Sequence, residues 1–239
     1  MTHTMRRTLA LSFILLIGGC SGEQTVTSPA QTKAQEHYNY ITPKAVDLKK
    51  LLPNPSADKS PISKGEGDLM IAIQAESSSA AKERAKSEDT FTPWTYADVL
   101  GPGFAKDKMP LTAALLDKVE QDTHAATEDA KRLWNRTRPP RQDSRVTPFL
   151  KVPTNASYPS GHATRAIVWA KLLGALDPKH KDALRERARL VALDRVIAGV
   201  HYPTDVAAGM ALGDEIADKF LASPAFQADL EKAKAEWQH

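Results

Sequence analysis

Tyr158-Pro159-Ser160-Gly161-His162 stands directly before a regular helical pattern that covers residues 161–176. Ser160 is a favourable N-cap for that helix, and its apolar residues repeat on one face. Backbone N–H groups at a helix start are free to bind an anion, and a glycine allows close approach. The segment therefore predicts an anion site with His162 in the first turn. The alternative is a simple serine N-cap followed by an exposed histidine.

A second segment combines Asp194-Arg195 with His201-Tyr202-Pro203-Thr204-Asp205. Arg195 falls on an apolar helical face, where a guanidinium is costly unless it meets an anion; a structural salt bridge is the alternative. Asp205 follows His201 by four residues, so its carboxylate can accept a hydrogen bond from one imidazole nitrogen. The other nitrogen is then available as a nucleophile or base. Helix capping by Asp205 is the alternative.

A third segment places Lys131 and Arg138 seven residues apart. They lie at the end of a predicted helix over residues 111–136, which two prolines terminate. Both side chains are therefore expected to reach one pocket. Three further arginines lie nearby, and we expect most of these side chains to be solvated: Arg132, Arg136 and Arg141.

The rest of the sequence favours helices as well. No stretch alternates convincingly as a strand, so we predict an all-α helical bundle that forms a single domain over residues 40–239. Residues 40–68 carry several prolines and glycines and should be irregular. Further helices are predicted over residues 69–86, 179–198 and 204–220, with loops over 90–104 and 142–158.

The N-terminus has the pattern of an export signal. A basic start and a short apolar stretch end in Leu16-Ile17-Gly18-Gly19-Cys20-Ser21, which resembles the bacterial lipobox. We expect residues 1–19 to be a lipoprotein signal peptide, Cys20 to be acylated, and residues 20–39 to be a flexible tether. The protein would then be exported and anchored to the outer membrane on its periplasmic side. Ordinary signal cleavage with an incidental cysteine is the alternative.

Composition narrows the function classes. Cys20 is the only cysteine among 239 residues, so no intramolecular disulfide is expected. Removal of residues 1–19 lowers the net charge from +3 to +1, and nothing resembles a nucleic-acid-binding face. His162 and His201 lack partners at metal-ligand spacings, so we expect neither a metal nor another cofactor.

The three segments together are more specific than any one of them. Lys-x6-Arg-Pro, Pro-Ser-Gly-His and Arg-x5-His-x3-Asp, in that order, resemble the type 2 phosphatidic acid phosphatase and vanadium haloperoxidase superfamily. The strings at residues 135–139 and 157–162 look most like its bacterial class A non-specific acid phosphatases, and the resemblance covers about residues 40–220. It implies a helical, metal-independent acid phosphatase that hydrolyses small phosphate monoesters through a phosphohistidine intermediate.

The resemblance also implies a role for each residue of the motifs. His201 would be the nucleophile, Asp205 would orient it, and His162 would protonate the leaving alkoxide and then help to activate water. The equatorial phosphate oxygens would be bound by Lys131, Arg138, Ser160, Gly161 and Arg195. Fixed cations suit phosphoryl transfer because the reaction depends on placement and charge neutralisation.

One position departs from the family pattern. Asp194 stands where the family usually has serine, and its carboxylate either repels phosphate in the pocket or pairs with an arginine outside it. Three other functions remain open for this pocket: a vanadium-dependent haloperoxidase, a lipid or pyrophosphate phosphatase, and a non-catalytic anion-binding lipoprotein. The membrane branch of the superfamily is disfavoured because no long apolar run follows residue 20.

Overall fold

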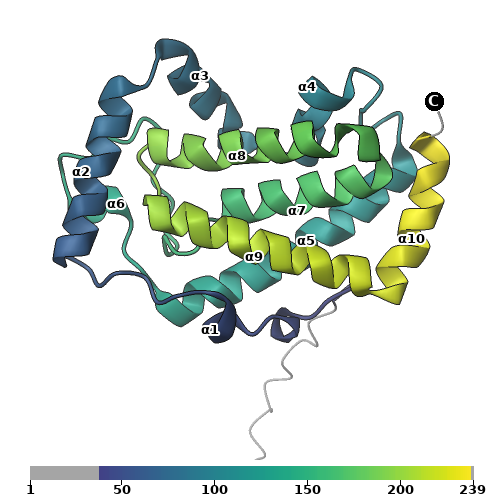
Figure 1. Ribbon diagram of the computed structural model, residues 1–239, viewed down its shortest axis with the longest axis horizontal. Coiled ribbons are helices and arrows are strands. Elements are labelled where there is room, and N and C mark those ends of the chain that lie inside the picture. The colour runs from purple at the N-terminus through teal and green to yellow at the C-terminus, as the bar shows by residue number, and fades with distance from the viewer. Residues whose placement is uncertain (1–37, 238–239) are drawn as a thin grey trace, which may run out of the picture. The chain divides into compact units, whose positions relative to one another are not determined.

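A computed structural model describes residues 38–237, and through this range it contains helices and no strands (Figure 1). The all-α prediction is therefore confirmed. The predicted signal peptide, Cys20 and nearly all of the tether lie outside the described residues. The helices are α1 (Leu48–Leu51), α2 (Pro61–Glu76), α3 (Ser79–Ser87), α4 (Ala97–Leu100), α5 (Pro110–Trp134), α6 (Pro139–Gln142), α7 (Gly161–Leu176), α8 (Lys181–Ile197), α9 (Pro203–Ala222) and α10 (Pro224–Lys234). Short 3-10 turns are η1 (Pro43–Ala45), η2 (Glu88–Thr90), η3 (Pro93–Tyr96), η4 (Pro178–His180) and η5 (Ala235–Trp237).

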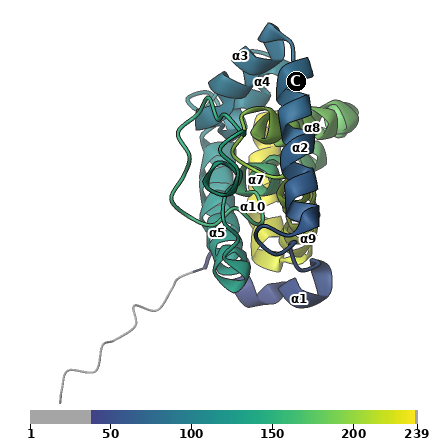
Figure 2. The same cartoon turned by 90° about the vertical axis from the view of Figure 1, so that its left-hand side faces the viewer.

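The centre of the bundle is α7, which runs between α8 and α9 and also packs on α5 (Figures 1 and 2). Its apolar residues lie all round the helix rather than on one stripe, and a helix of that kind must be buried on every side. Leu172 and Leu173, for example, are both fully buried although they point in different directions. None of the helices between residues 38 and 237 is long and apolar enough to cross a membrane.

Two glycines let α9 approach the start of α7 closely. A Cβ atom on Gly209 would lie 2.5 Å from the Ser160 carbonyl oxygen, and one on Gly213 would lie 2.5 Å from that of Thr164. These distances are too short for any side chain. The backbone N–H of Ser160 also donates to the carbonyl oxygen of Asp205 at 2.9 Å. The N-termini of α7 and α9 are thereby joined, and both carry predicted site residues.

The predictions of individual helices hold best in the second half of the chain. α7 has the predicted bounds, and α5, α8 and α9 each lie within about two residues of theirs. The predicted helix over 69–86 is instead two helices, because Ser78 caps α3 by accepting from the Ala81 N–H. The prediction of an irregular 40–68 is partly wrong, since α2 begins at Pro61 behind an N-cap at Ser60.

Two other stretches also differ from prediction. Residues 90–104 contain the short turns η3 and α4 rather than loop alone. At the C-terminal end, α10 was not predicted, although Ser223 caps it and Pro224 occupies its first position, where a missing N–H has no cost. Residues 143–158 form no helix or strand, as predicted.

Candidate active site

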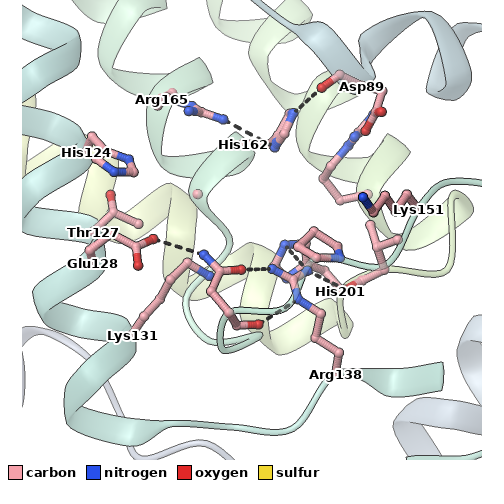
Figure 3. Close-up of a pocket in the computed structure, with 15 residues that line it drawn as sticks. Asp89, His124, Thr127, Glu128, Lys131, Arg138, Lys151, His162, Arg165 and His201 are labelled. Atoms are coloured by element: carbon pink, nitrogen blue, oxygen red, sulfur yellow. Dashed lines mark hydrogen bonds between the residues drawn. The ribbon is translucent and has the colours of Figure 1, made fainter. Parts of the chain in front are cut away.

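The three sequence segments meet at one cavity of about 200 Å³ (Figure 3). Lys131 comes from the last turn of α5 and Arg138 directly precedes α6. Gly161 begins α7, where the Ser160 cap leaves the first backbone N–H groups free. Six of the eight predicted residues line the cavity: Lys131, Arg138, Gly161, His162, Arg195 and His201.

A tight turn between α8 and α9 brings Arg195 and His201 to the same cavity. Gly199 adopts a φ of 77° there, in the left-handed region that favours glycine. A Cβ atom at this position would also lie 2.8 Å from the Gln74 side chain and 3.1 Å from Pro148. The five-residue spacing between the arginine and the histidine is therefore the length of one compact turn.

His201 presents one nitrogen to the cavity and the other to the protein. Its Nε2 atom lies 3.1 Å from Nη1 of Arg138, and its Nδ1 atom lies 3.4 Å from Oδ2 of Asp205. Because a guanidinium only donates, Nε2 must carry the lone pair and Nδ1 the proton. Burial, followed by the charge of Arg138, lowers the pKa of His201 to about 3. The imidazole is therefore neutral across the physiological range.

Asp205 is fully buried behind His201 and receives more hydrogen bonds than the histidine alone supplies. Arg136 Nη1 donates to Oδ1 at 2.6 Å, while Ser157 Oγ, at 2.5 Å, and the Tyr202 N–H, at 2.9 Å, donate to Oδ2. Burial opposes ionisation, but His201 and the other donors outweigh it and keep the pKa of Asp205 below its usual value. The carboxylate is thus fixed in charge and in position.

Arg136 is the exception among the three nearby arginines, most of which we expected to be solvated. Arg132 and Arg141 are exposed, but Arg136 is 3% exposed, and its guanidinium lies 3.9 Å from the centre of the Tyr202 ring. Its second partner is Glu66 of α2, whose Oε2 atom accepts from Nη2 at 2.5 Å. Arg136 can be buried because a carboxylate more than sixty residues away in the sequence offsets the cost, and the local pattern does not reveal that partner.

His162 lies across the cavity from His201. Its Nε2 atom is 3.3 Å from the carbonyl oxygen of Asp89, and Nη2 of Arg165 is 3.4 Å from its Nδ1 atom (Figure 3). Burial, followed by the charges of Arg195 and Arg165, holds the pKa of His162 well below its ordinary value. The surrounding protein groups therefore favour a neutral imidazole whose Nε2–H donates to the carbonyl.

Three buried cations line the cavity. Arg138 donates through Nη2 to Oδ1 of Asn155 at 2.8 Å, and burial lowers its pKa only to about 10, so it stays charged. Lys131 donates to the Ala156 carbonyl at 2.5 Å; burial and then Arg138 lower its pKa to about 7. Arg195 donates from Nη2 to the carbonyl oxygen of Ala85 at 2.9 Å, and its buried Nε–H has no partner among the described residues.

Asp205 lies behind His201, and two other residues singled out from the sequence, Ser160 and Asp194, do not line the cavity either. Ser160 is fully buried, and its hydroxyl accepts from the Ala163 N–H at 3.4 Å as the N-cap of α7. Asp194 is also fully buried, and both of its oxygens accept from Arg84 at 2.8 Å. Of the two alternatives for Asp194, pairing with an arginine outside the pocket is the one found.

The family model described as the PAP2 superfamily matches residues 113–216, a range that contains all of the predicted motif residues. The chain contains a PAP2 superfamily domain. The resemblance drawn from the three motifs is therefore confirmed.

Curated relatives of this PAP2 domain include phosphatases. A non-specific acid phosphatase of Providencia stuartii is 31% identical over 149 residues, which cover 59% of each chain. A decaprenylphosphoryl-5-phosphoribose phosphatase of Mycobacterium tuberculosis is 40% identical over 93 residues, which cover 38% of this chain and 49% of that protein. The matched regions thus span about half to three-fifths of the length of these two relatives.

A solved structure shares the fold. A bacterial vanadium-dependent iodoperoxidase aligns with a TM-score of 0.52 at 18% identity, over 73% of this chain and 54% of that one. At this identity the likeness concerns the helical fold alone.

Several residues that line the cavity were not predicted from the sequence. Glu128 lies one helical turn before Lys131 on α5, so its position on the same face was available as a signal. Asp89 contributes a backbone carbonyl, which no residue type reveals. The other lining residues not predicted are His124, Thr127, Lys151, Pro153, Asn155, Arg165 and Val200. Among residues 38–237, no three His, Cys, Asp or Glu side chains gather closely enough to hold a metal ion.

Proposed function

We propose that this protein is an acid phosphatase that hydrolyses phosphate monoesters through a phosphohistidine at Nε2 of His201. The observation that carries the proposal is that His201 lines a cavity bordered by three buried cations, one of which, Arg138, lies beside the lone pair of Nε2. Asp205 holds the opposite nitrogen and stabilises the positive charge that the imidazole gains on attack. A neutral nucleophile next to fixed positive charge is the combination that a phosphate dianion requires.

Phosphate binding would use the donors that the protein leaves available. Lys131, Arg138 and Arg195 point to the cavity from three different elements, so they can contact different equatorial oxygens. The free N–H groups at the start of α7 add neutral donors. Because the cations are fixed by carbonyl and amide partners, little reorganisation is needed as charge moves in the transition state.

His162 would carry the proton in both steps. A bound dianion raises the pKa of His162 and so opposes the effect of Arg195 and Arg165. As the His201 Nε2–P bond forms, the ester P–O bond breaks, and His162 gives its proton to the leaving alkoxide. In the second step neutral His162 takes a proton from water, the water oxygen attacks phosphorus, and the N–P bond breaks to release phosphate.

Activity should not depend on a divalent metal, because three cationic side chains supply the positive charge. Purified protein assayed on an aryl phosphate should keep its turnover after treatment with EDTA. Loss of turnover on chelation that is restored by a divalent ion would contradict the proposed function. The same preparation with added vanadate should not oxidise bromide or chloride, and such oxidation would favour a haloperoxidase instead.

The value of kcat/KM should fall as pH rises through neutrality. Lys131, whose pKa is lowered to about 7, loses its proton over this range, whereas the lowered pKa of His162 in the free enzyme places its proton loss at more acid pH. His201 stays neutral above about pH 3 and sets no alkaline limit. We expect kcat/KM to be at least about tenfold higher near pH 5.5 than near pH 8, measured in buffers of constant ionic strength. A profile that still rises above about pH 9 would contradict these assignments.

We also propose that the protein is exported and anchored through acylated Cys20, on the strength of the Ile17-Gly18-Gly19-Cys20 pattern. Multiple acyl chains hold a protein firmly on a membrane, whereas one chain binds weakly. Wild-type protein should sediment with membranes and be released by detergent, and Cys20→Ala should fail to mature as a lipoprotein. A wholly soluble wild type cleaved elsewhere would overturn the anchor and leave the phosphatase proposal standing.

A further inference from the structure

Asp194, next to Arg195 in sequence, belongs to a buried pair of carboxyl groups outside the cavity. Both oxygens of Asp194 accept from Arg84 of α3. The carboxyl group of Glu88, in η2, lies in hydrogen-bonding contact with Asp194. Glu88 is 1% exposed, and its Oε1 atom accepts from Arg187. Its Oε2 atom is buried and meets no donor in the part of the chain that the structure describes.

Two carboxylates in buried contact repel each other, and this repulsion favours a proton on one of them. The hydrogen bonds indicate which of the two carboxyl groups carries the proton. Asp194 already has both oxygens paired with a guanidinium, whereas Glu88 has one paired oxygen and one without a donor. A proton on Oε2 of Glu88 turns the unpaired acceptor into a donor toward Asp194. Burial, and then the contact with Asp194, raises the pKa of Glu88 to about 7 against the charge of Arg187.

The segment that contains Glu88 also contacts two residues of the active site. The carbonyl oxygen of Ala85, in α3, accepts from Arg195, and that of Asp89, in η2, faces Nε2 of His162 (Figure 3). Both carbonyls lie within three residues of Glu88 along the chain. Contacts between this segment and α8 therefore determine where Arg195 and His162 find their backbone partners.

We propose that Glu88 and Asp194 share one proton, and that the pair fixes the segment α3–η2 against α8 over the active site. This inference rests on the proposed phosphatase function. In that function Glu88 and Asp194 are positioning residues that act through the carbonyls of Ala85 and Asp89. Loss of the shared proton places two buried negative charges in contact and loosens the segment. Titratable or charged groups around Glu88 are Arg84, Arg187, Asp194, Arg195, Tyr96 and Asp98.

The test uses Glu88→Gln, because an amide has the shape of the protonated acid and permanently supplies the donor. Glu88 binds its proton more tightly in the folded protein than in the unfolded chain. Wild type therefore gains stability in acid. It loses that stability as pH rises from the pKa of Glu88 in the unfolded chain toward its pKa of about 7 in the folded protein. Between about pH 5.5 and 8.5 the melting temperature of wild type should fall by about 5 °C more than that of Glu88→Gln.

Activity gives the second measurement. The ionisation of substrate and of the site histidines is common to both proteins, so it cancels in the ratio of their kcat/KM values. The ratio of Glu88→Gln to wild type should rise at least about threefold between pH 5.5 and 8.5, because only wild type loses the contact. A purely structural loss of stability would not produce a pH-dependent ratio below the melting range.

Two further variants sharpen the result. Glu83→Gln changes an exposed carboxylate of the same helix, paired with Lys86, and should shift neither the pH dependence of melting nor the activity ratio. Asp194→Asn gives Glu88 an amide donor, so it should also flatten the pH dependence of melting. It leaves Arg84 without its carboxylate, but that side chain is 34% exposed and can be solvated.

The inference fails if Glu88→Gln melts with the same pH dependence as wild type, or if the activity ratio is flat. These outcomes are distinct from failure of the proposed function. An inactive wild-type protein would contradict the phosphatase, and the melting experiment would still decide whether the proton is shared. An active wild type with an unchanged Glu88→Gln would overturn this inference alone.

Discussion

Replacing His201 with alanine should abolish turnover, with kcat lowered by at least about 10³-fold. The reason is geometric: Nε2 of His201 is the nitrogen with a lone pair beside Arg138, and its opposite side is fixed by Asp205. His162 is the second imidazole of the cavity, but in the described structure its Nε2–H is directed to the Asp89 carbonyl. The measurement is steady-state hydrolysis of an aryl phosphate by purified protein.

The matched control is His180→Ala, which makes the same chemical change at a histidine outside the cavity. His180 pairs with Asp177 at the start of α8 and contacts none of the site residues. This control should keep wild-type kcat, and the melting temperature of His201→Ala will report any loss of fold. A folded His201→Ala protein with a tenth or more of wild-type kcat would exclude His201 as the nucleophile.

Replacing His162 with alanine should slow alkyl phosphates far more than aryl phosphates. An alkoxide is a poor leaving group and needs the proton, whereas a nitrophenolate leaves without it. General acid catalysis typically contributes about 10²–10⁴-fold, so we expect a loss in that range for an alkyl ester and a smaller loss for 4-nitrophenyl phosphate.

The comparison of two substrates on one variant is its own control, because altered folding or phosphate binding lowers both rates together. Equal losses on both substrates would argue against His162 as the general acid. The residual activity on the aryl ester should also lose the part of its pH dependence that comes from His162.

The three motifs, with the helical pattern around them, were sufficient to predict the helical fold and six of the residues that meet at the cavity. They succeed because each motif sits at a helix end, where local rules operate. Ser160 caps α7, Asn135 ends α5 in the left-handed conformation, and Gly199 makes the turn before His201. The single-helix prediction over 69–86 failed at Ser78, where a side-chain cap starts a new helix.

The surroundings of the site depend on contacts between distant residues, so the sequence could not reveal them. Arg136 looked like part of a solvated basic run, yet Glu66 and Asp205 make it a buried link between α2 and α9. Asp194 looked unfavourable for phosphate binding until its partner Arg84 was located 110 residues earlier. Local patterns indicate which residues a helix end presents, whereas charge compensation is a property of the packed fold.

The central claim is a covalent bond between phosphorus and Nε2 of His201. Rapid acid-free quenching of enzyme mixed with a ³²P-labelled monoester, followed by peptide mapping, tests it most directly. The account predicts label on the peptide that contains His201, stable to alkali and lost in acid as expected for a phosphoramidate. It also predicts no label in His201→Ala and more accumulated label in His162→Ala with an aryl ester, since water activation is then slow. Label on another residue would contradict the mechanism. Absence of label from an active enzyme would also contradict it, when a phosphohistidine standard survives the same work-up.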